Sequence, residues 1–317
     1  MKLKSIPTFE DIQLIHKRIK PFINKTPVLT SSSLDHISGA NLFFKCENFQ
    51  KIGAFKMRGA SNALLALSQK ERDQGVATHS SGNHAQAVAL SARNHQTKSY
   101  IVMPENAPAI KRAATAGYGA EIITCAPTLE ARESTLQAVV EKTGATFIHP
   151  YNNYDVIGGQ ATCAKELLEE VGQLDVVMAP IGGGGLMSGT ALSTRHLSPN
   201  TRIIGSEPKW ADDAYRSFKS GTMQYNTRVD TIADGLRTNL GVYTFEIITK
   251  MVDDIITVSE EEIVAAMRLI WERMKIIIEP SCAVPFAALL QQKDRFSGKK
   301  VGIILTGGNV DVENLPF

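Results

Sequence analysis

Four consecutive glycines, Gly182 to Gly185, follow an apolar run at residues 174–180 and open a segment with helical character. The apolar run is typical of a strand buried in a parallel sheet. Without side chains the backbone can approach a ligand closely, and the N–H groups at a helix start attract an anion. An ordinary tight turn is the alternative, but it does not need the backbone entropy that four glycines cost. The segment therefore predicts a phosphate-binding loop in an α/β fold.

A nucleotide is one candidate source of that phosphate. However, the dinucleotide fingerprint G-x-G-x-x-G is followed by an acidic residue about 20 positions on. Here an isolated lysine motif precedes the glycine loop instead. A nucleotide therefore explains fewer residues of this chain.

The lysine motif is Lys56, which lies between Phe55 and the Arg58-Gly59-Ala60 run at a helix start. Burial disfavours the ammonium form, so a lysine among apolar neighbours loses its proton readily and can condense with an aldehyde. The alternative is an ordinary solvated helix lysine, since most lysines are solvated. Taken with the phosphate loop, Lys56 indicates pyridoxal phosphate as the aldehyde.

Two polar segments complete the set of candidate site motifs. Residues 78–89 have the pattern of a strand end, a turn with Ser80, Ser81 and Asn83, and a helix start, which suits a carboxylate. A plain helix cap is the alternative for this turn. Near the other end, the strand at residues 301–305 delivers Thr306 and two glycines, at the edge where α/β sheets bind ligands.

Together these segments resemble the fold-type II pyridoxal-phosphate enzymes, and within them the serine/threonine dehydratase family that includes serine racemase and threo-3-hydroxyaspartate ammonia-lyase. The resemblance covers nearly the whole chain. It implies an α/β fold of two three-layer domains, each with a parallel sheet, and a cofactor in the cleft between them. We expect residues 1–74 and 152–317 to form the large domain and residues 75–151 the small one.

The resemblance also implies a role for each site residue. Lys56 would form the Schiff base with the cofactor and remove the α-proton, while Ser81 would act as acid/base on the opposite face. The cofactor would contact Phe55, Asn83, the backbone of Gly182, Gly183, Gly184, Gly185 and Leu186, then Gly235 and, at its pyridine nitrogen, Thr306. The substrate carboxylate would be received by Ser80, Ser81, Asn83 and His84, and Arg132 would approach a second carboxylate.

The same resemblance implies the reaction and the assembly. We expect β-elimination of L-threo-3-hydroxyaspartate, L-serine or L-threonine to a keto acid and ammonia, linked serine racemisation, and a homodimer. A β-replacement enzyme of the cysteine synthase type is one alternative. A non-catalytic nucleotide-binding protein is the alternative from a different class.

A metal site is expected in residues 207–213, which we place on a loop after a strand at residues 203–205. Its oxygen groups suit a hard cation, although an acidic surface loop is the plain alternative. The stretch resembles the serine racemase metal site. By that resemblance Glu207, the Ala211 carbonyl and Asp213 would bind Mg²⁺, Mn²⁺ or Ca²⁺ in a structural role.

Composition excludes several other classes of function. The 317 residues are 43% hydrophobic, enough for a large core and two domains. A net charge of +2 without basic clusters argues against nucleic-acid or membrane partners, and no apolar run approaches the roughly 18 residues of a membrane span. The four cysteines form no C-x-x-C pair, which favours reduced thiols in a cytoplasmic protein. The family resemblance implies that its small-molecule partner is an amino acid.

Overall fold

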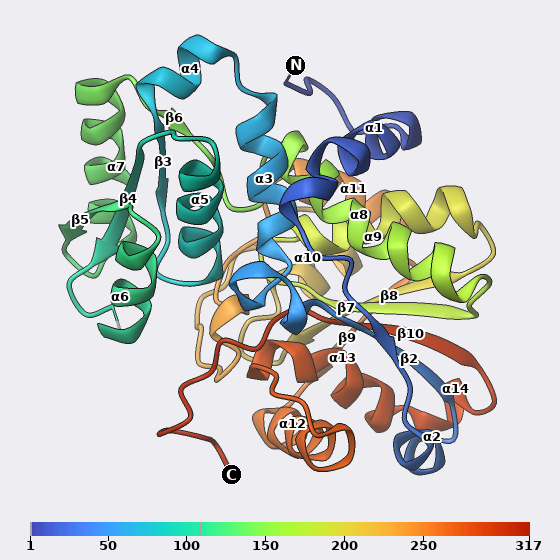
Figure 1. Ribbon diagram of the computed structural model, residues 1–317. Helices are drawn as coiled ribbons and strands as arrows, with labels where there is room; N and C mark the ends of the chain where they lie inside the picture. The colour runs from blue at the N-terminus through green and yellow to red at the C-terminus, as the bar shows by residue number, and fades with distance from the viewer. Residues whose placement is uncertain (1, 108) are drawn as a thin grey trace.

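The computed structural model describes residues 2–107 and 109–317 and contains two β-sheets with helices packed against them (Figure 1). The fold is of the α/β class, as expected from the sequence. None of the helices in these described ranges is long and apolar enough to cross a membrane.

The larger sheet has six strands in the order β1-β2-β10-β7-β8-β9. Their bounds are Val28–Leu29 (β1), Asn41–Cys46 (β2), Val176–Pro180 (β7), Arg202–Pro208 (β8), Asp254–Val258 (β9) and Lys300–Leu305 (β10). Only β1 is paired antiparallel, at the edge of the sheet. Strands β2 and β10 are neighbours although they come from opposite ends of the chain, with Leu305 opposite Cys46. This pairing places the residues that follow the two strands at the same edge of the sheet.

Helices cover both faces of the larger sheet (Figure 1). One face carries α13, and α12 packs on it; α2 and α14 lie on the same side in Figure 1. The other face carries α8 and α9, with α1, α3 and α11 packed against them and α10 packed on β9 and α11. The bounds are Phe9–Ile19 (α1), Ser32–Ser38 (α2), Lys56–Ala66 (α3), Tyr154–Val171 (α8), Gly185–Leu197 (α9), Asp213–Ser220 (α10), Val242–Met251 (α11), Glu260–Met274 (α12), Pro280–Gln291 (α13) and Lys293–Phe296 (α14).

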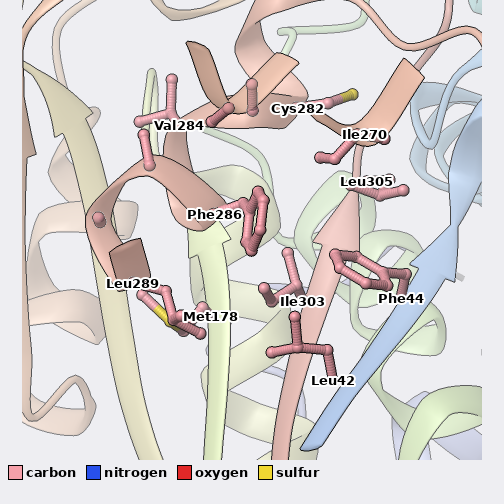
Figure 2. Close-up of a cluster of buried hydrophobic side chains, with 14 of the residues drawn as sticks. Leu42, Phe44, Met178, Ile270, Cys282, Val284, Phe286, Leu289, Ile303 and Leu305 are labelled. Carbon is pink, nitrogen blue, oxygen red and sulfur yellow. The ribbon is translucent and has the colours of Figure 1, made fainter. Parts of the chain in front are cut away.

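The core beneath this sheet is formed by apolar side chains of α12, α13 and the central strands (Figure 2). Phe44 of β2 and Phe286 of α13 meet edge to face, with ring centroids 6.0 Å apart. Cys282 lies in the first turn of α13 at the edge of the same cluster. Burial of this surface is the main stabilising contribution and makes α13 a fixed support for the strand ends.

The smaller sheet has four parallel strands in the order β5-β4-β3-β6. Figure 1 shows α5 and α7 on opposite sides of it, with α6 beside α5 and α4 leading into it. The bounds are Gln69–Gln74 (α4), Val76–His79 (β3), Asn83–Asn94 (α5), Ser99–Pro104 (β4), Ala109–Gly117 (α6), Glu121–Cys125 (β5), Leu129–Thr143 (α7) and Thr146–Phe147 (β6).

Four short 3₁₀ helices complete the described elements, and two of them flank the site described below. Their bounds are Lys20–Phe22 (η1), Glu47–Phe49 (η2), Lys51–Gly53 (η3) and Asp234–Leu236 (η4). The sequence prediction was wrong about Glu207, because this residue lies within β8 and not on the loop after it. The paired part of that strand runs further than the apolar residues 203–205 that suggested it, since β9 continues beside it to Val258.

Candidate active site

Lys56 is the first residue of α3, and the chain just before it is joined to the loop after β10. The Phe55 N–H donates to the Thr306 carbonyl at 3.0 Å, and the Gly308 N–H donates to the Gly53 carbonyl at 2.9 Å. An isolated β-bridge joins Ala54 to Gly307. The lysine and the Thr306-Gly307-Gly308 run, which are far apart in the sequence, therefore belong to one rigid unit.

A network of buried ion pairs holds α3 in place. The Arg58 guanidinium is fully buried and pairs with Glu47 at 2.8 Å and with Glu166 at 2.7 Å, and Lys45 also pairs with Glu166 at 2.8 Å. Burial lowers the pKa of Arg58, but the Glu47 and Glu166 carboxylates outweigh it and hold the pKa well above its usual range. Removing one partner of such a network leaves an uncompensated buried charge, which typically costs about 3–5 kcal/mol. Arg58 thus fixes the helix that begins with Lys56.

The Lys56 amine is partly buried and donates to the Pro150 carbonyl at 2.9 Å. Burial lowers the pKa of Lys56 to about 8, against the opposing pull of the Glu279 carboxylate. The amine lies 5.2 Å from the centre of the Phe55 ring. The direction of this pKa shift agrees with the expectation for a lysine among apolar neighbours, and it makes the neutral fraction near neutral pH larger than that of an ordinary lysine.

Glu279 is a site residue that the sequence reasoning did not single out. It precedes Pro280 at the start of α13, is buried, and accepts from the Asn83 amide at 3.1 and 3.0 Å. Burial raises the pKa of Glu279 to about 7, and the nearby Asp234 carboxylate adds to the rise. The Asn83 amide oxygen accepts from Asn309 at 2.8 Å. An acidic residue before a helix-opening proline was the one sequence signal for this role.

The turn between β3 and α5 presents Ser80, Ser81 and Asn83 with partly buried side chains. The Ser80 hydroxyl accepts from the Gly82 N–H at 3.3 Å, which fixes the turn. Since α5 begins at Asn83, the first N–H groups of that helix have no intrahelical acceptor and remain available to an anion.

The structure indicates which atom of His84 could donate to a substrate carboxylate. Its Nε2 lies 3.0 Å from the Ile148 carbonyl, which only accepts, so Nε2 carries the proton. Burial, followed by the Lys56 charge, lowers the pKa of His84 well below its usual value, so the ring is neutral. Nδ1 is then a bare acceptor, and it has no hydrogen-bond partner within residues 2–107 and 109–317. The ring therefore cannot donate a hydrogen bond to a carboxylate, whereas the backbone N–H of His84 can.

The glycine loop has the geometry of a close-approach turn between β7 and α9. Gly184 has φ +83°, in the left-handed region, and a Cβ on Gly183 would come within 2.2 Å of the Tyr151 ring. A Cβ on Gly182 would meet the Gly235 carbonyl at 3.0 Å. The fold therefore brings the glycine loop against Gly235 and against Tyr151, which the sequence analysis did not name.

Two further residues line this region without having been predicted. His149 accepts at Nδ1 from the Asn152 N–H at 2.9 Å, and burial, with His79 and Lys56, lowers its pKa to about 4. Lys111 of α6 pairs with Asp234 of η4, so an ion pair links a helix of the smaller sheet to the loop beside Gly235. No local motif marks these residues, because only the fold makes them neighbours.

Arg132 lies in the first turn of α7 and donates from Nε to the Thr128 carbonyl at 3.3 Å. After burial, its positive charge is the next cause that lowers the pKa of His79. Helix α7 packs on β3, the strand that leads to the Ser80 turn.

Glu207 and Asp213 lie close together and are buried. Glu207 accepts from the Tyr215 N–H at 2.7 Å, and Asp213 accepts from the Leu240 N–H at 2.7 Å. Burial and the Asp213 charge raise the pKa of Glu207 well above its usual value, and burial raises that of Asp213 to about 6. A buried carboxylate whose charge is destabilised by a second buried carboxylate is an environment that a cation would stabilise. In the described ranges the two residues form no cluster of three or more His, Cys, Asp or Glu side chains suited to a metal.

Comparison with known proteins defines the class to which this fold and site belong. The family model described as "Pyridoxal-phosphate dependent enzyme" matches residues 19–307. The chain belongs to this family of pyridoxal-phosphate-dependent enzymes, as its motifs suggested. The interpretation as a non-catalytic nucleotide-binding protein is therefore wrong.

Two individual relatives and one solved structure are similar to this chain over nearly its whole length. The chain is 50% identical to serine racemase of Dictyostelium discoideum over 97% of its own length and 96% of that protein. It is 52% identical to L-threo-3-hydroxyaspartate ammonia-lyase of Saccharomyces cerevisiae, over 97% and 95% of the two chains. Among solved structures, the T.th. threonine deaminase has a TM-score of 0.92 at 42% identity, with 96% of this chain and 99% of that chain covered.

Proposed function

We propose that this enzyme catalyses β-elimination of β-hydroxy amino acids such as L-threo-3-hydroxyaspartate, L-serine or L-threonine, releasing a keto acid and ammonia, with serine racemisation at the same site. Similar identity to a serine racemase and to a hydroxyaspartate ammonia-lyase supports both activities. The observation that carries the proposal is a partly buried Lys56 with a lowered pKa that donates to the Pro150 carbonyl. The same segment contacts the His84 ring at Ile148 and the glycine loop at Tyr151. The β-replacement alternative has no such support among these relatives.

The residues present fit the cofactor. The glycine loop at the start of α9 would hold its phosphate by backbone N–H groups, with Leu186 as the last donor. Phe55 and Gly235 would lie beside the ring, Asn83 near the ring hydroxyl and Thr306 near the ring nitrogen. When bound, the cofactor supplies an aldehyde for amines and an electron sink for the bonds at the substrate α-carbon.

Lys56 is the base that takes the α-proton at Nζ, since only the neutral amine can accept a proton and the lowered pKa provides it. The Pro150 carbonyl orients this amine by accepting from it. Ser81 exchanges a proton on the opposite face, which racemisation needs and elimination from the L-enantiomer does not.

The turn at residues 80–84 receives the substrate carboxylate through the Ser80 and Ser81 hydroxyls and the N–H groups at the start of α5. His84 would donate from its backbone N–H, because its ring Nε2 already donates to the Ile148 carbonyl and its Nδ1 is an acceptor. Arg132 would approach the second carboxylate of a dicarboxylic substrate, where a guanidinium can pair bidentately.

Glu207, the Ala211 carbonyl and Asp213 would bind a divalent cation, Mg²⁺, Mn²⁺ or Ca²⁺, which removes the repulsion between the two carboxylates. Its role would be to brace the segment between β8 and α10. We further propose a cytoplasmic homodimer, with residues 1–74 and 152–317 as the large domain and 75–151 as the small domain.

One assay tests this function. Keto-acid release and enantiomer inversion are measured for L-threo-3-hydroxyaspartate, L-serine, L-threonine and D-serine with cofactor-saturated enzyme. We expect elimination from the L-substrates and interconversion of the serine enantiomers. Sulfide-dependent formation of cysteine from an activated serine, without keto-acid release, would instead establish the β-replacement reaction.

A further inference from the structure

Unlike a serine, Thr306 can place either a hydroxyl or a methyl group at the same position, depending on its rotamer. It follows the last residue of β10 and is almost fully buried, at 2% exposure. Its Cβ carries a hydroxyl and a methyl of similar size, so rotation about χ1 can exchange the two groups. A threonine that must offer a hydroxyl to a ligand therefore needs a partner that selects one rotamer.

Cys282 is that partner. Its sulfur lies 3.2 Å from the Thr306 hydroxyl oxygen. The same thiol is held by the next residue of the strand end, since it donates to the Gly307 carbonyl at 2.8 Å and accepts from the Gly307 N–H at 3.0 Å. Cys282 itself cannot move easily, because its helix is packed in the core shown in Figure 2.

The surroundings tie this pair to the candidate site. The Gly307 carbonyl also accepts from the Glu279 N–H at 3.0 Å, and the Thr306 carbonyl accepts from the Phe55 N–H at 3.0 Å. The Thr306 side chain is thus fixed from one side by the start of α13, while its backbone fixes the residue before Lys56.

We propose that Cys282 is a positioning residue that holds the Thr306 hydroxyl, rather than its methyl, toward the bound cofactor. This inference rests on the proposed placement of Thr306 beside the cofactor ring. Because the single thiol proton goes to the Gly307 carbonyl, the Thr306 hydroxyl donates to the sulfur, and its two acceptor positions remain for the ligand.

The protonation state of the thiol supports this role. Burial, followed by the Glu279 carboxylate, raises the pKa of Cys282 far above its usual value. The thiol is therefore neutral at every pH at which the enzyme is studied. A neutral thiol adds no charge next to the cofactor ring, in contrast to a carboxylate at the same position.

The test is a double-mutant cycle on cofactor affinity, measured by titrating cofactor-free enzyme with pyridoxal phosphate and following protein fluorescence. The variants are Cys282→Ala, Thr306→Val and the double variant, with Cys282→Ser as the conservative replacement. Cys46→Ala is the matched control. Cys46 is buried in the same core cluster and donates to the Phe44 carbonyl at 3.2 Å, but no side-chain hydrogen bond joins it to Thr306.

Cys282→Ala should weaken cofactor binding about fivefold, the equivalent of one hydrogen bond of about 1 kcal/mol. Cys46→Ala should leave the affinity unchanged at a similar loss of thermal stability, and Cys282→Ser should restore it. In the Thr306→Val background the cysteine replacement should have no further effect, since it acts through the hydroxyl.

One outcome would contradict the positioning role of Cys282, and another would contradict the cofactor contact of Thr306. If Thr306→Val weakens cofactor binding but Cys282→Ala does not, or if the two effects add, then Cys282 does not position the hydroxyl. If Thr306→Val itself binds the cofactor as wild type does, Thr306 is not a cofactor contact, and its placement in the proposed function fails while the reaction assay stays unaffected.

Discussion

Replacement of Glu279 by glutamine should change how the stability of the protein depends on pH. The folded-state pKa of this carboxyl is about 7, compared with 4.5 for an unperturbed glutamate. Because the folded pKa is raised, the folded protein binds the proton more tightly than the unfolded chain does. Glu279 therefore lowers the free energy of unfolding progressively as pH rises from 4.5 through 7.

The size of this effect follows from the two pKa values. Between about pH 5 and about pH 8 they correspond to a loss of roughly 2.5 kcal/mol from this one group. Glu279→Gln keeps the shape but cannot ionise, so the variant should avoid that loss. Its amide nitrogen would face the Asn83 amide nitrogen, so one hydrogen bond is lost at both pH values, at about 1 kcal/mol.

The assay is urea unfolding of the cofactor-free protein at about pH 5 and about pH 8, because a bound cofactor would add its own pH-dependent stabilisation. We expect the stability difference between variant and wild type to shift by about 2–3 kcal/mol in favour of the variant at the higher pH. Glu121→Gln, at an exposed position in β5, should show no such shift. Parallel pH profiles for Glu279→Gln and wild type would refute the conclusion that Glu279 is a carboxyl with a strongly raised pKa.

Lys56→Ala should abolish turnover and the near-visible absorbance of the bound cofactor, with an unchanged far-UV spectrum; retained absorbance would assign the covalent link to another lysine. Ser81→Ala should suppress racemisation and elimination from D-serine while elimination from L-serine continues, and equal losses would leave Ser81 as a binder only. Chelation of the metal should lower the melting temperature by several degrees, as expected for loss of about 3 kcal/mol of cation binding, and Mg²⁺ should restore it. An unchanged melting temperature, with metal loss verified by elemental analysis, would contradict the cation site. Arg132→Ala should reduce turnover of L-threo-3-hydroxyaspartate at least about tenfold more than that of L-serine, whereas proportional losses would exclude a carboxylate contact.

The local elements were largely predictable from the sequence. The capping box at Thr8, the proline that stops α1, and the capping box of Ser259 and Glu262 are local devices that satisfy helix ends. The glycine loop between β7 and α9 was predictable for the same reason, since a left-handed residue at Gly184 is a property of the local backbone. The family resemblance also followed from the sequence, because several unrelated motifs occur in a fixed order.

The tertiary structure alone decided which distant groups meet. Glu279 has its pKa near 7 because folding removes it from water and places Asp234 nearby, and neither cause is visible in a string of residues. Folding also brings Cys282 to Thr306 and pairs Lys111 with Asp234. It likewise engages Nε2 of His84, so that Nδ1 is a bare acceptor. Sequence determines which chemical groups are available and where helices and strands begin, because those effects act over a few residues. Burial and pairing act across the whole fold, so the protonation states and contacts of this site depend on how β2, β10 and α13 come together.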